Sequence, residues 1–233
     1  MVLSIITFGQ IQTQNMLQEI KCTPPQFTGI EKAIPSQAEN RFPTIEQYLK
    51  KNINYPDDDV IYGIQGTEVA KFVITQTGDI TDITIINSVS KNMDKELIRV
   101  LKNTNGMWKP GYNDDKPEIM EKEVSLVFKI QGLEKYDFNY RAKTCFAKGN
   151  IQLLNKGNPK KALKYFDKVI VLLPNDKALL VQRGLARYEA GNKDGAFRDW
   201  NRVRMLGGVE SKSYLENFSN LKGYAGLVRT LEN

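Results

Sequence analysis

The chain has 233 residues, 41% of them hydrophobic and 26% charged, which is typical of globular proteins and excludes disordered, collagen-like and membrane-spanning classes. It contains no histidine, so the commonest general base near neutral pH and the commonest nitrogen ligand for zinc are missing. Residues 1–130 carry 14 Lys/Arg and 17 Asp/Glu, whereas residues 131–233 carry 19 and 10. Length and charge together predict two domains, of which the second is basic.

The N-terminus holds an apolar run from Val2 to Phe8 that is too short to cross a bilayer. Two interpretations stay open. Residues 1–9 are either the end of a signal peptide whose start lies upstream, with cleavage before Gln10, or a frayed apolar terminus. We favour the truncated signal, which predicts a periplasmic protein, whereas the alternative predicts a cytoplasmic one. In either case we expect no membrane span.

Residues 10–41 are predicted to be a linker, because the stretch after Lys21 is rich in Pro, Gln and Thr. Cys22 lies in this stretch, and Cys145 lies 123 residues further along the chain. That separation excludes a CxxC metal or redox motif, so we expect two independent thiols.

A helix and a hairpin are predicted after the linker. Thr44 is placed to cap a short amphipathic helix that ends near residues 54–56. The period of the apolar residues then changes to two. Within residues 65–75, Ala70, Phe72 and Ile74 fall on one face of an extended chain and the residues between them on the other. After a turn at residues 77–79, residues 80–86 continue the period of two as a return strand, which predicts two antiparallel strands.

A second helix and a last strand complete this half. The helix is predicted over Met93–Lys102, with a buried stripe of Leu97, Val100 and Leu101, and the strand over Glu121–Ile130. Helix, hairpin, helix and strand predict a small α+β sandwich with its helices on one face of an antiparallel sheet.

A series of short motifs, in this order, resembles the C-terminal domain of TonB-type energy transducers, especially its variants in Bacteroidetes-like envelopes. The resemblance covers residues 42–130. It is carried by Tyr55-Pro56, Gly63-Ile64-Gln65-Gly66, Val69 to Val73, Gly78, Ile80, Ile83, Ser88, Met93-Asp94-Lys95-Glu96, Trp108-Lys109-Pro110-Gly111, Lys116-Pro117 and Val127-Phe128.

The resemblance implies a periplasmic domain that captures an extended peptide of an outer-membrane transporter by adding it as a strand to an exposed sheet edge. It also implies where the contacts lie. The expected partner-binding residues are the segment around the Tyr-Pro pair and the last strand, namely Asn52, Asn54, Tyr55, Pro56, Val124, Leu126, Phe128 and Ile130. Energy-transducing members carry a membrane helix and a Pro-rich spacer before this domain. The sequence contains neither, so we expect a relay of energy to need a partner that supplies the anchor.

The second half contains an internal repeat. The segment Gly157–Phe166 is followed, at a displacement of 34 residues, by the similar segment Gly191–Trp200. The paired positions are Asn158 with Asn192, Ala162 with Ala196, Phe166 with Trp200 and Val169 with Val203. This period resembles the tetratricopeptide (TPR) repeat, whose helical hairpins bury their apolar faces by stacking. We predict two repeats over residues 138–208 and a capping helix over residues 209–233.

The resemblance to TPR proteins places first helices along a concave groove. The candidate partner-binding residues on that surface are Asn150, Leu154, Arg183, Arg187 and Tyr188. Arg183 and Arg187 are four residues apart, so they share a helix face and could clamp a carboxylate or an acidic peptide. The alternative is a pair of solvated surface arginines.

The sequence carries no motif for catalysis, cofactor binding or nucleic-acid binding. GxSxG, HExxH, P-loop and GxGxxG arrangements are absent, and the run Asp57–Asp59 lacks the spaced ligands of a calcium loop. We therefore expect no catalytic residue, no metal, no cofactor and no nucleic-acid partner. The sequence predicts a TonB-like sandwich followed by an all-α TPR domain, acting as an envelope adaptor that binds proteins or peptides. The alternative is a component of TonB-linked transport at the outer membrane.

Overall fold

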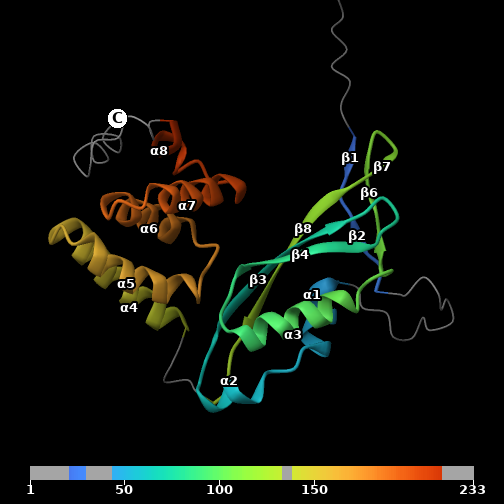
Figure 1. Cartoon of the computed structure of the whole chain (residues 1–233), viewed down its shortest axis with the longest axis horizontal. Coiled ribbons are helices and arrows are strands. Elements are labelled where there is room, and N and C mark those ends of the chain that lie inside the picture. Colours follow the sequence, from blue (N-terminus) through green and yellow to red (C-terminus); the bar gives the residue numbers. More distant parts are fainter. Residues whose placement is uncertain (1–20, 30–43, 133–137, 217–233) are drawn as a thin grey trace, which may run out of the picture.

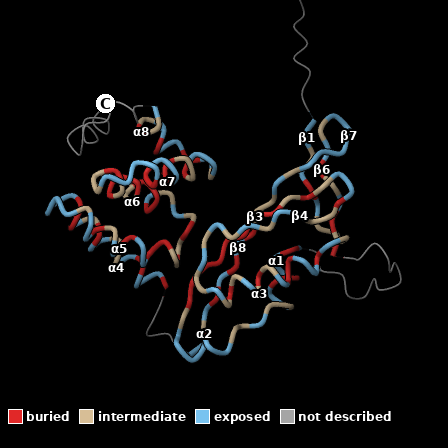
Figure 2. Tube along the Cα trace, viewed as in Figure 1, coloured by how far each residue is buried: buried red, intermediate tan, exposed pale blue. Residues whose placement is uncertain are grey.

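The computed structural model describes residues 21–29, 44–132 and 138–216, which form an α+β half and an all-helical half lying side by side (Figure 1). Each half has its own hydrophobic core, and the buried residues of the two cores appear as separate groups in Figure 2. Each half therefore packs around a cluster of buried residues of its own.

The α+β half is built on a three-stranded antiparallel sheet in the order β4-β3-β8. β3 spans Gly66–Ile74, β4 spans Ile80–Asn87 and β8 spans Met120–Phe128. β3 is the central strand because it pairs with both others. All nine of its residues pair with β8 without a register shift, whereas its pairing with β4 is interrupted twice.

Two helices cover one face of this sheet (Figure 1). α1 (Ile45–Asn52) is capped by Thr44, whose hydroxyl accepts the N–H of Gln47, and α3 (Lys91–Lys102) is capped by Ser90. The predicted helices and hairpin are confirmed, because hydroxyl caps and apolar periodicity are local signals. Between the helices and the sheet lies a core that includes Leu49, Phe72, Ile74, Leu97, Leu101, Trp108, Val124, Leu126 and Phe128.

The segment predicted to be a linker contributes two short strands to this half. β1 (Cys22–Thr23) pairs with β6 (Gly111–Asn113), and β2 (Gln26–Phe27) pairs with β5 (Trp108–Lys109). Phe27 packs edge-on against Trp108 and Tyr48, with ring centroids 5.1 and 5.7 Å away. Burial of this aromatic ring explains why part of a Pro-rich segment is ordered. The other residues of the predicted linker lie outside the described ranges, as do residues 1–9.

Two further elements were not predicted. α2 (Asp57–Ile61) follows Pro56, and β7 (Lys116–Glu118) forms a hairpin with β6. Asp114 and Asp115, at the tip of that hairpin, both have positive φ angles of 47° and 61°. Positive φ at both central residues is the geometry that closes tight hairpins, and Asp tolerates it better than most residues do.

The helical half consists of α4 (Phe138–Asn150), a π-helical turn η3 (Ile151–Asn155), α5 (Pro159–Ile170), α6 (Lys177–Glu189), α7 (Lys193–Met205) and α8 (Lys212–Glu216). Its two sequence repeats adopt equivalent local structures. Asn158 caps α5 and Asn192 caps α7, each accepting the N–H three residues on. Gly157 and Gly191, which precede these caps, have positive φ angles of 56° and 88°, which glycine adopts without steric cost.

The repeated aromatic residues are fully buried at equivalent places. Phe166 packs against Gly149 and Trp200 packs against Gly184, so close that a Cβ on either glycine would overlap the ring. In α8, Tyr214 stacks on Trp200 with ring centroids 5.1 Å apart. α8 is the described beginning of the predicted capping helix, and residues 217–233 of that prediction lie outside the described ranges.

The two halves are joined by hydrogen bonds between β3 and the loop that connects α5 and α6. The N–H of Thr67 donates to the carbonyl of Val171 at 2.9 Å, and its hydroxyl donates to the carbonyl of Leu172 at 2.6 Å. The preceding residue, Gly66, lies so close to the Val171 carbonyl that a Cβ would stand 2.8 Å from its oxygen. These contacts require glycine at position 66 and fix the helical half against the outer face of the sheet.

Glu68, the next residue of β3, is fully buried beside the start of α3. Its Oε1 accepts the N–H of Val89 at 2.7 Å. Burial raises the pKa of Glu68 to about 8, and the neighbouring Asp94 adds to the rise, whereas the Val89 N–H opposes it. The side chain is therefore protonated in the folded protein at neutral pH, because an isolated buried carboxylate is costly.

This protonation makes stability depend on pH. Between a pH near 4.5 and a pH near 8 the unfolded chain loses the Glu68 proton and the folded protein keeps it. The free energy of unfolding should therefore decrease as pH rises through that window, by up to about 1.4 kcal/mol for each pH unit. Glu68→Gln should flatten the curve, as measured by urea unfolding across this pH window. Glu46→Gln, at an exposed site on α1, is the control. Parallel curves for Glu68→Gln and the unmodified protein would contradict the assignment.

Candidate functional site

β8 forms an edge of the sheet, because in the described part of the chain it pairs with β3 alone. The hydrogen bonds of Thr67 in β3 show which backbone groups of β8 face outward. The N–H of Thr67 bonds Val171 and its carbonyl accepts the Nδ2 of Asn87, so neither group bonds β8. Val127, its register partner, must then direct its own N–H and C=O away from β3. By the alternation of an antiparallel ladder, the outward-facing residues are Glu121, Glu123, Ser125 and Val127.

The β8 edge is a better template for an added strand than the β4 edge. The β3–β4 pairing shifts register twice, and Asp82 in β4 has a φ of 51°. Bulges of this kind twist an edge and discourage pairing. β8 has no such interruption over nine paired residues. Its outward N–H and C=O groups form a regular row that has no backbone partner among residues 21–29, 44–132 and 138–216.

The predicted contact residues of the last strand lie on the other phase of this alternation. Val124, Leu126 and Phe128 are buried in the core under α1 and α3. These three residues pair with Ala70, Glu68 and Gly66 of β3, so their backbone N–H and C=O groups point toward β3. Ile130 lies beyond the strand, where its N–H donates to Oε1 of Gln65 at 2.9 Å. An added strand would therefore contact residues 121, 123, 125 and 127 instead. The alternation of β8 residues can be predicted from the sequence, but the sequence does not show which of the two sets of alternate residues faces the helices.

The residues around the Tyr-Pro pair are held by α3 and by the core. The N–H of Asn54 donates to Oε1 of Glu96 at 2.7 Å, and Arg99 bonds both Glu96 and the carbonyl of Asn52. Pro56 precedes α2 and lines an open hollow with Asn54. These contacts give this segment a structural role, and the hollow leaves one side of it open.

Tyr55 is anchored at both ends of its side chain. Its hydroxyl donates to the carbonyl of Ile64 at 2.6 Å, and its ring packs edge-on against Phe128 with centroids 5.3 Å apart. Burial, followed by the nearby charge of Asp59, raises the pKa of Tyr55 to about 12. Such a side chain stabilises the turn, and a partner could contact only its remaining surface.

On the helical side, Arg183 and Arg187 are both bound by the buried carboxylate of Asp199 in α7. Arg183 makes two hydrogen bonds to Asp199, of 2.9 and 2.6 Å, and Arg187 makes one of 2.7 Å. Arg183 also lies 3.7 Å from Asp167 of α5. Both arginines of α6 therefore turn toward the second helix of each repeat, not toward the surface formed by the first helices.

The other predicted groove residues are divided between core and surface. Tyr188 is buried beside Trp200, with ring centroids 6.1 Å apart, and Lys193 lies over its ring. Asn150 and Leu154 lie at the junction of α4 and the π-helical turn, where Leu154 is exposed. A partner at the first-helix surface would thus find Leu154, with Asn150 beside it, but not Tyr188.

A charged clamp joins the two halves at β8. Arg202 of α7 bonds both carboxylate oxygens of Glu123, at 2.7 and 2.5 Å, and the side chain of Asn175 at 2.8 Å. Asn175 also reaches the hydroxyl of Ser125 at 3.3 Å. Sequence reasoning missed this clamp, because Arg202 and Glu123 are 79 residues apart and nothing local links them.

A groove lies beside this clamp, between the outer face of the sheet and the helices α6 and α7. Its volume is about 380 Å³. We call it the junction groove. It is lined by Lys71, Ile86, Asn87, Glu123, Ile170, Pro174, Asn175, Leu180, Arg183, Arg187, Phe197, Arg198, Asp199, Asn201, Arg202 and Met205.

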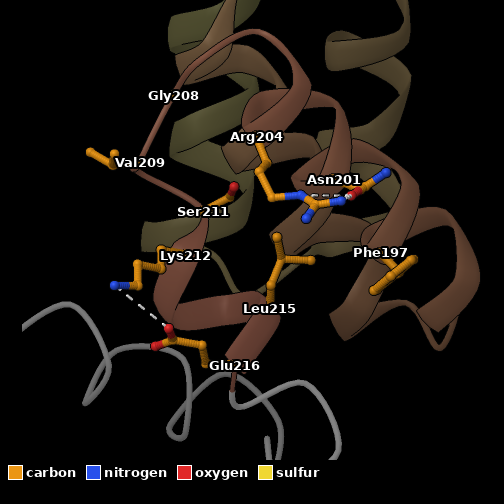
Figure 3. A pocket seen from close by; sticks show the side chains of 9 residues that line it. All are labelled: Phe197, Asn201, Arg204, Gly208, Val209, Ser211, Lys212, Leu215 and Glu216. Atoms are coloured by element: carbon orange, nitrogen blue, oxygen red, sulfur yellow. Dashed lines mark hydrogen bonds and ion pairs between the residues drawn. The ribbon is translucent and has the colours of Figure 1, made fainter. Parts of the chain in front are cut away.

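A second hollow of about 500 Å³ lies between α7 and α8, at the far end of the helical half (Figure 3). Phe197, Leu215 and Val209 give it apolar walls, and along the α7 wall the side chain of Arg204 bonds that of Asn201. An open apolar surface at the last helix pair is what a further helix would cover in a stacked repeat.

The described ranges contain neither a cluster of metal ligands nor a membrane-spanning helix. No group of three or more His, Cys, Asp or Glu residues there could hold a metal ion. No helix among those residues combines the length and apolar character needed to cross a membrane. Cys22 and Cys145 are free thiols.

Comparison with known proteins supports the resemblance of the α+β half. Residues 51–130 match the family described as Gram-negative bacterial TonB protein C-terminal. Among solved structures, two NMR solution structures of the Helicobacter pylori TonB-CTD are similar, each with 19% identity over 37% of this chain. They are covered to 90% and 78% of their lengths, with TM-scores of 0.31 and 0.32. Among curated proteins, no match is found. Over residues 51–130 the α+β half is thus similar to the TonB C-terminal family.

The Arg202–Glu123 pair should couple the two halves energetically. In a double-mutant cycle with Arg202→Gln and Glu123→Gln, we expect an interaction energy of about 1 kcal/mol or more, because the pair is bidentate and mostly buried. Urea unfolding measures each free energy. The exposed pair of Lys212 and Glu216, 3.8 Å apart, is the matched control and should give a smaller value. Additive effects at the junction would show that the clamp does not couple the halves.

Proposed function

We propose that this protein is a non-catalytic adaptor of the Gram-negative envelope that binds other polypeptides through its two halves. The α+β half captures an extended peptide by strand addition at the β8 edge. The helical half supplies a second protein-binding surface. The observation that carries the proposal is the uninterrupted edge of β8 in a domain similar to the TonB C-terminal family.

Strand addition is supported by the chemistry of this edge. The outward-facing residues have side chains on the outer face of the sheet, and Val127 is 59% exposed. Unpaired backbone groups would give affinity, and the alternating side chains would give selection. Glu121 forms an ion pair with Lys71, and Glu123 forms one with Arg202. Charged side chains of this kind on an edge strand disfavour unspecific pairing between copies of the chain.

The helical half is best interpreted as two TPR repeats. Two helical hairpins with equivalent caps, turns and buried aromatics at a spacing of 34 residues support this interpretation. TPR-type stacks act through their surfaces and not by catalysis, which agrees with the absence of histidine from the sequence.

The second candidate function is a component of TonB-linked transport. It is favoured by the family match, because domains of this type bind proteins such as outer-membrane transporters in the envelope. On this hypothesis the captured peptide belongs to a transporter, and the protein acts in the periplasm. The Bacteroidetes-type origin of the domain is part of the same hypothesis.

The substitution Val127→Pro should weaken strand addition at the β8 edge without disturbing the fold. The N–H of Val127 faces outward, so Val127→Pro removes an edge donor without removing a ladder bond. Peptides selected from a random display library on the full chain provide the probe. We expect Val127→Pro to weaken their binding by about tenfold or more, and Val127→Thr, which keeps the N–H, to preserve it.

Hydrogen exchange gives a direct readout of the same event. Peptide binding should slow exchange at the outward amides of residues 121, 123, 125 and 127, whereas the neighbouring ladder amides are protected before binding. Protection at β4 instead, or equal binding by the proline and threonine variants, would rule out strand addition at β8.

A further inference from the structure

The junction groove has walls from both halves and is therefore a different surface from the face of the first helices. Lys71, Ile86 and Asn87 come from the sheet, and Phe197, Arg198 and Met205 come from α7. The Thr67 hydrogen bonds and the Arg202–Glu123 clamp hold these walls in place. Both halves are therefore needed to form the groove.

Positive charge gathers at this groove. Arg183 and Arg187 share the carboxylate of Asp199, and Arg183 also lies 3.7 Å from Asp167, which is outside the groove lining. The lining as a whole contains five Lys or Arg residues and two Asp or Glu residues. Arg198 is exposed, and it forms no ion pair with any residue in the described ranges. Residues 138–216 as a whole carry 16 Lys/Arg and 7 Asp/Glu. The local and the overall field both favour a negatively charged partner.

Apolar side chains are exposed along the same groove. Ile86 is 43% exposed, Phe197 45% and Met205 59%. Single exposed apolar residues need no explanation, but three that line one recess beside arginines have the composition of a protein-binding site. Arg and aromatic residues also dominate the energetics of such sites.

We propose that the junction groove binds a segment of a partner polypeptide that is rich in Asp and Glu and carries apolar side chains between them. The carboxylates would pair with Arg198 and with the cluster of Arg183 and Arg187, and the apolar side chains would pack on Phe197, Met205 and Ile86. This inference names the partner class for the helical half of the adaptor, and in that respect it rests on the proposed function.

The shape and lining of the groove favour a peptide over other anions. A recess of about 380 Å³ admits side chains, whereas the flat surface of an anionic membrane could reach only its rim. Glu123 and Asp199 also line the groove, and their carboxylates would repel the closely spaced phosphates of a nucleic acid. An acidic peptide can place its charges apart and offers apolar groups as well.

Fluorescence anisotropy with a defined probe tests the proposal on the full chain. The probe is a labelled peptide that repeats Glu-Asp-Leu, and its counterpart repeats Lys-Lys-Leu. The acidic peptide should bind and the basic one should not. Arg198→Glu and Phe197→Ser should each weaken binding by about tenfold or more, since each removes one half of the proposed recognition. The control is Lys143→Glu on α4, which makes the same charge change at an exposed site outside the groove.

Each alternative occupant has its own outcome. Absent binding of the acidic peptide, or equal weakening by Arg198→Glu and Lys143→Glu, overturns the proposal. The proposal is also overturned if the chain binds phosphatidylglycerol vesicles as tightly as the acidic peptide and Phe197→Ser does not change that binding. It is likewise overturned if the chain associates with itself and Arg198→Glu abolishes this association. The variant Val127→Pro should retain acidic-peptide binding even though it blocks strand addition, so failure of the groove and failure of the edge are told apart.

Discussion

The hydrogen bonds that Thr67 makes to the α5–α6 loop are the contact on which the rest of the structure depends. Its N–H and hydroxyl bond the carbonyls of Val171 and Leu172. These bonds satisfy two loop carbonyls that would otherwise be buried without donors, and they occupy the side of β3 that β8 does not use. Because β3 is the central strand, the same contact sets which backbone groups of β8 face outward. It also holds α7 near the sheet, where Arg202 can reach Glu123.

Features determined by local chemistry could be predicted from the sequence. Thr44 caps a helix because its hydroxyl needs only a nearby N–H, and Asn158 and Asn192 cap helices for the same reason. The β3–β4 hairpin follows from alternation and a Gly-containing turn. The pairing of Phe166 with Trp200 across the repeat correctly identified two buried residues, because a period of 34 conserves the position of each helix in its hairpin.

Features determined by distant residues could not be predicted. Spacing shows that Arg183 and Arg187 share a helix face, but not that Asp199 lies between them on the next helix. Alternation shows that Val124, Leu126 and Phe128 share a side of their strand, but the position of α1 and α3 decides that this side is the core. Phe27 was assigned to a linker because its partners, Tyr48 and Trp108, are 21 and 81 residues away.

The two proposed binding surfaces meet at Glu123, which gives the arrangement of the halves a physical consequence. The backbone of Glu123 belongs to the outward phase of β8, while its side chain lines the junction groove and bonds Arg202. A strand added at the edge would therefore run beside the groove, within reach of a segment bound there. One partner that engaged both surfaces would bind the second intramolecularly and gain affinity without new contacts. This gain requires a rigid junction, so loss of the Arg202–Glu123 clamp should reduce the affinity for such a partner more than the affinity for either segment alone.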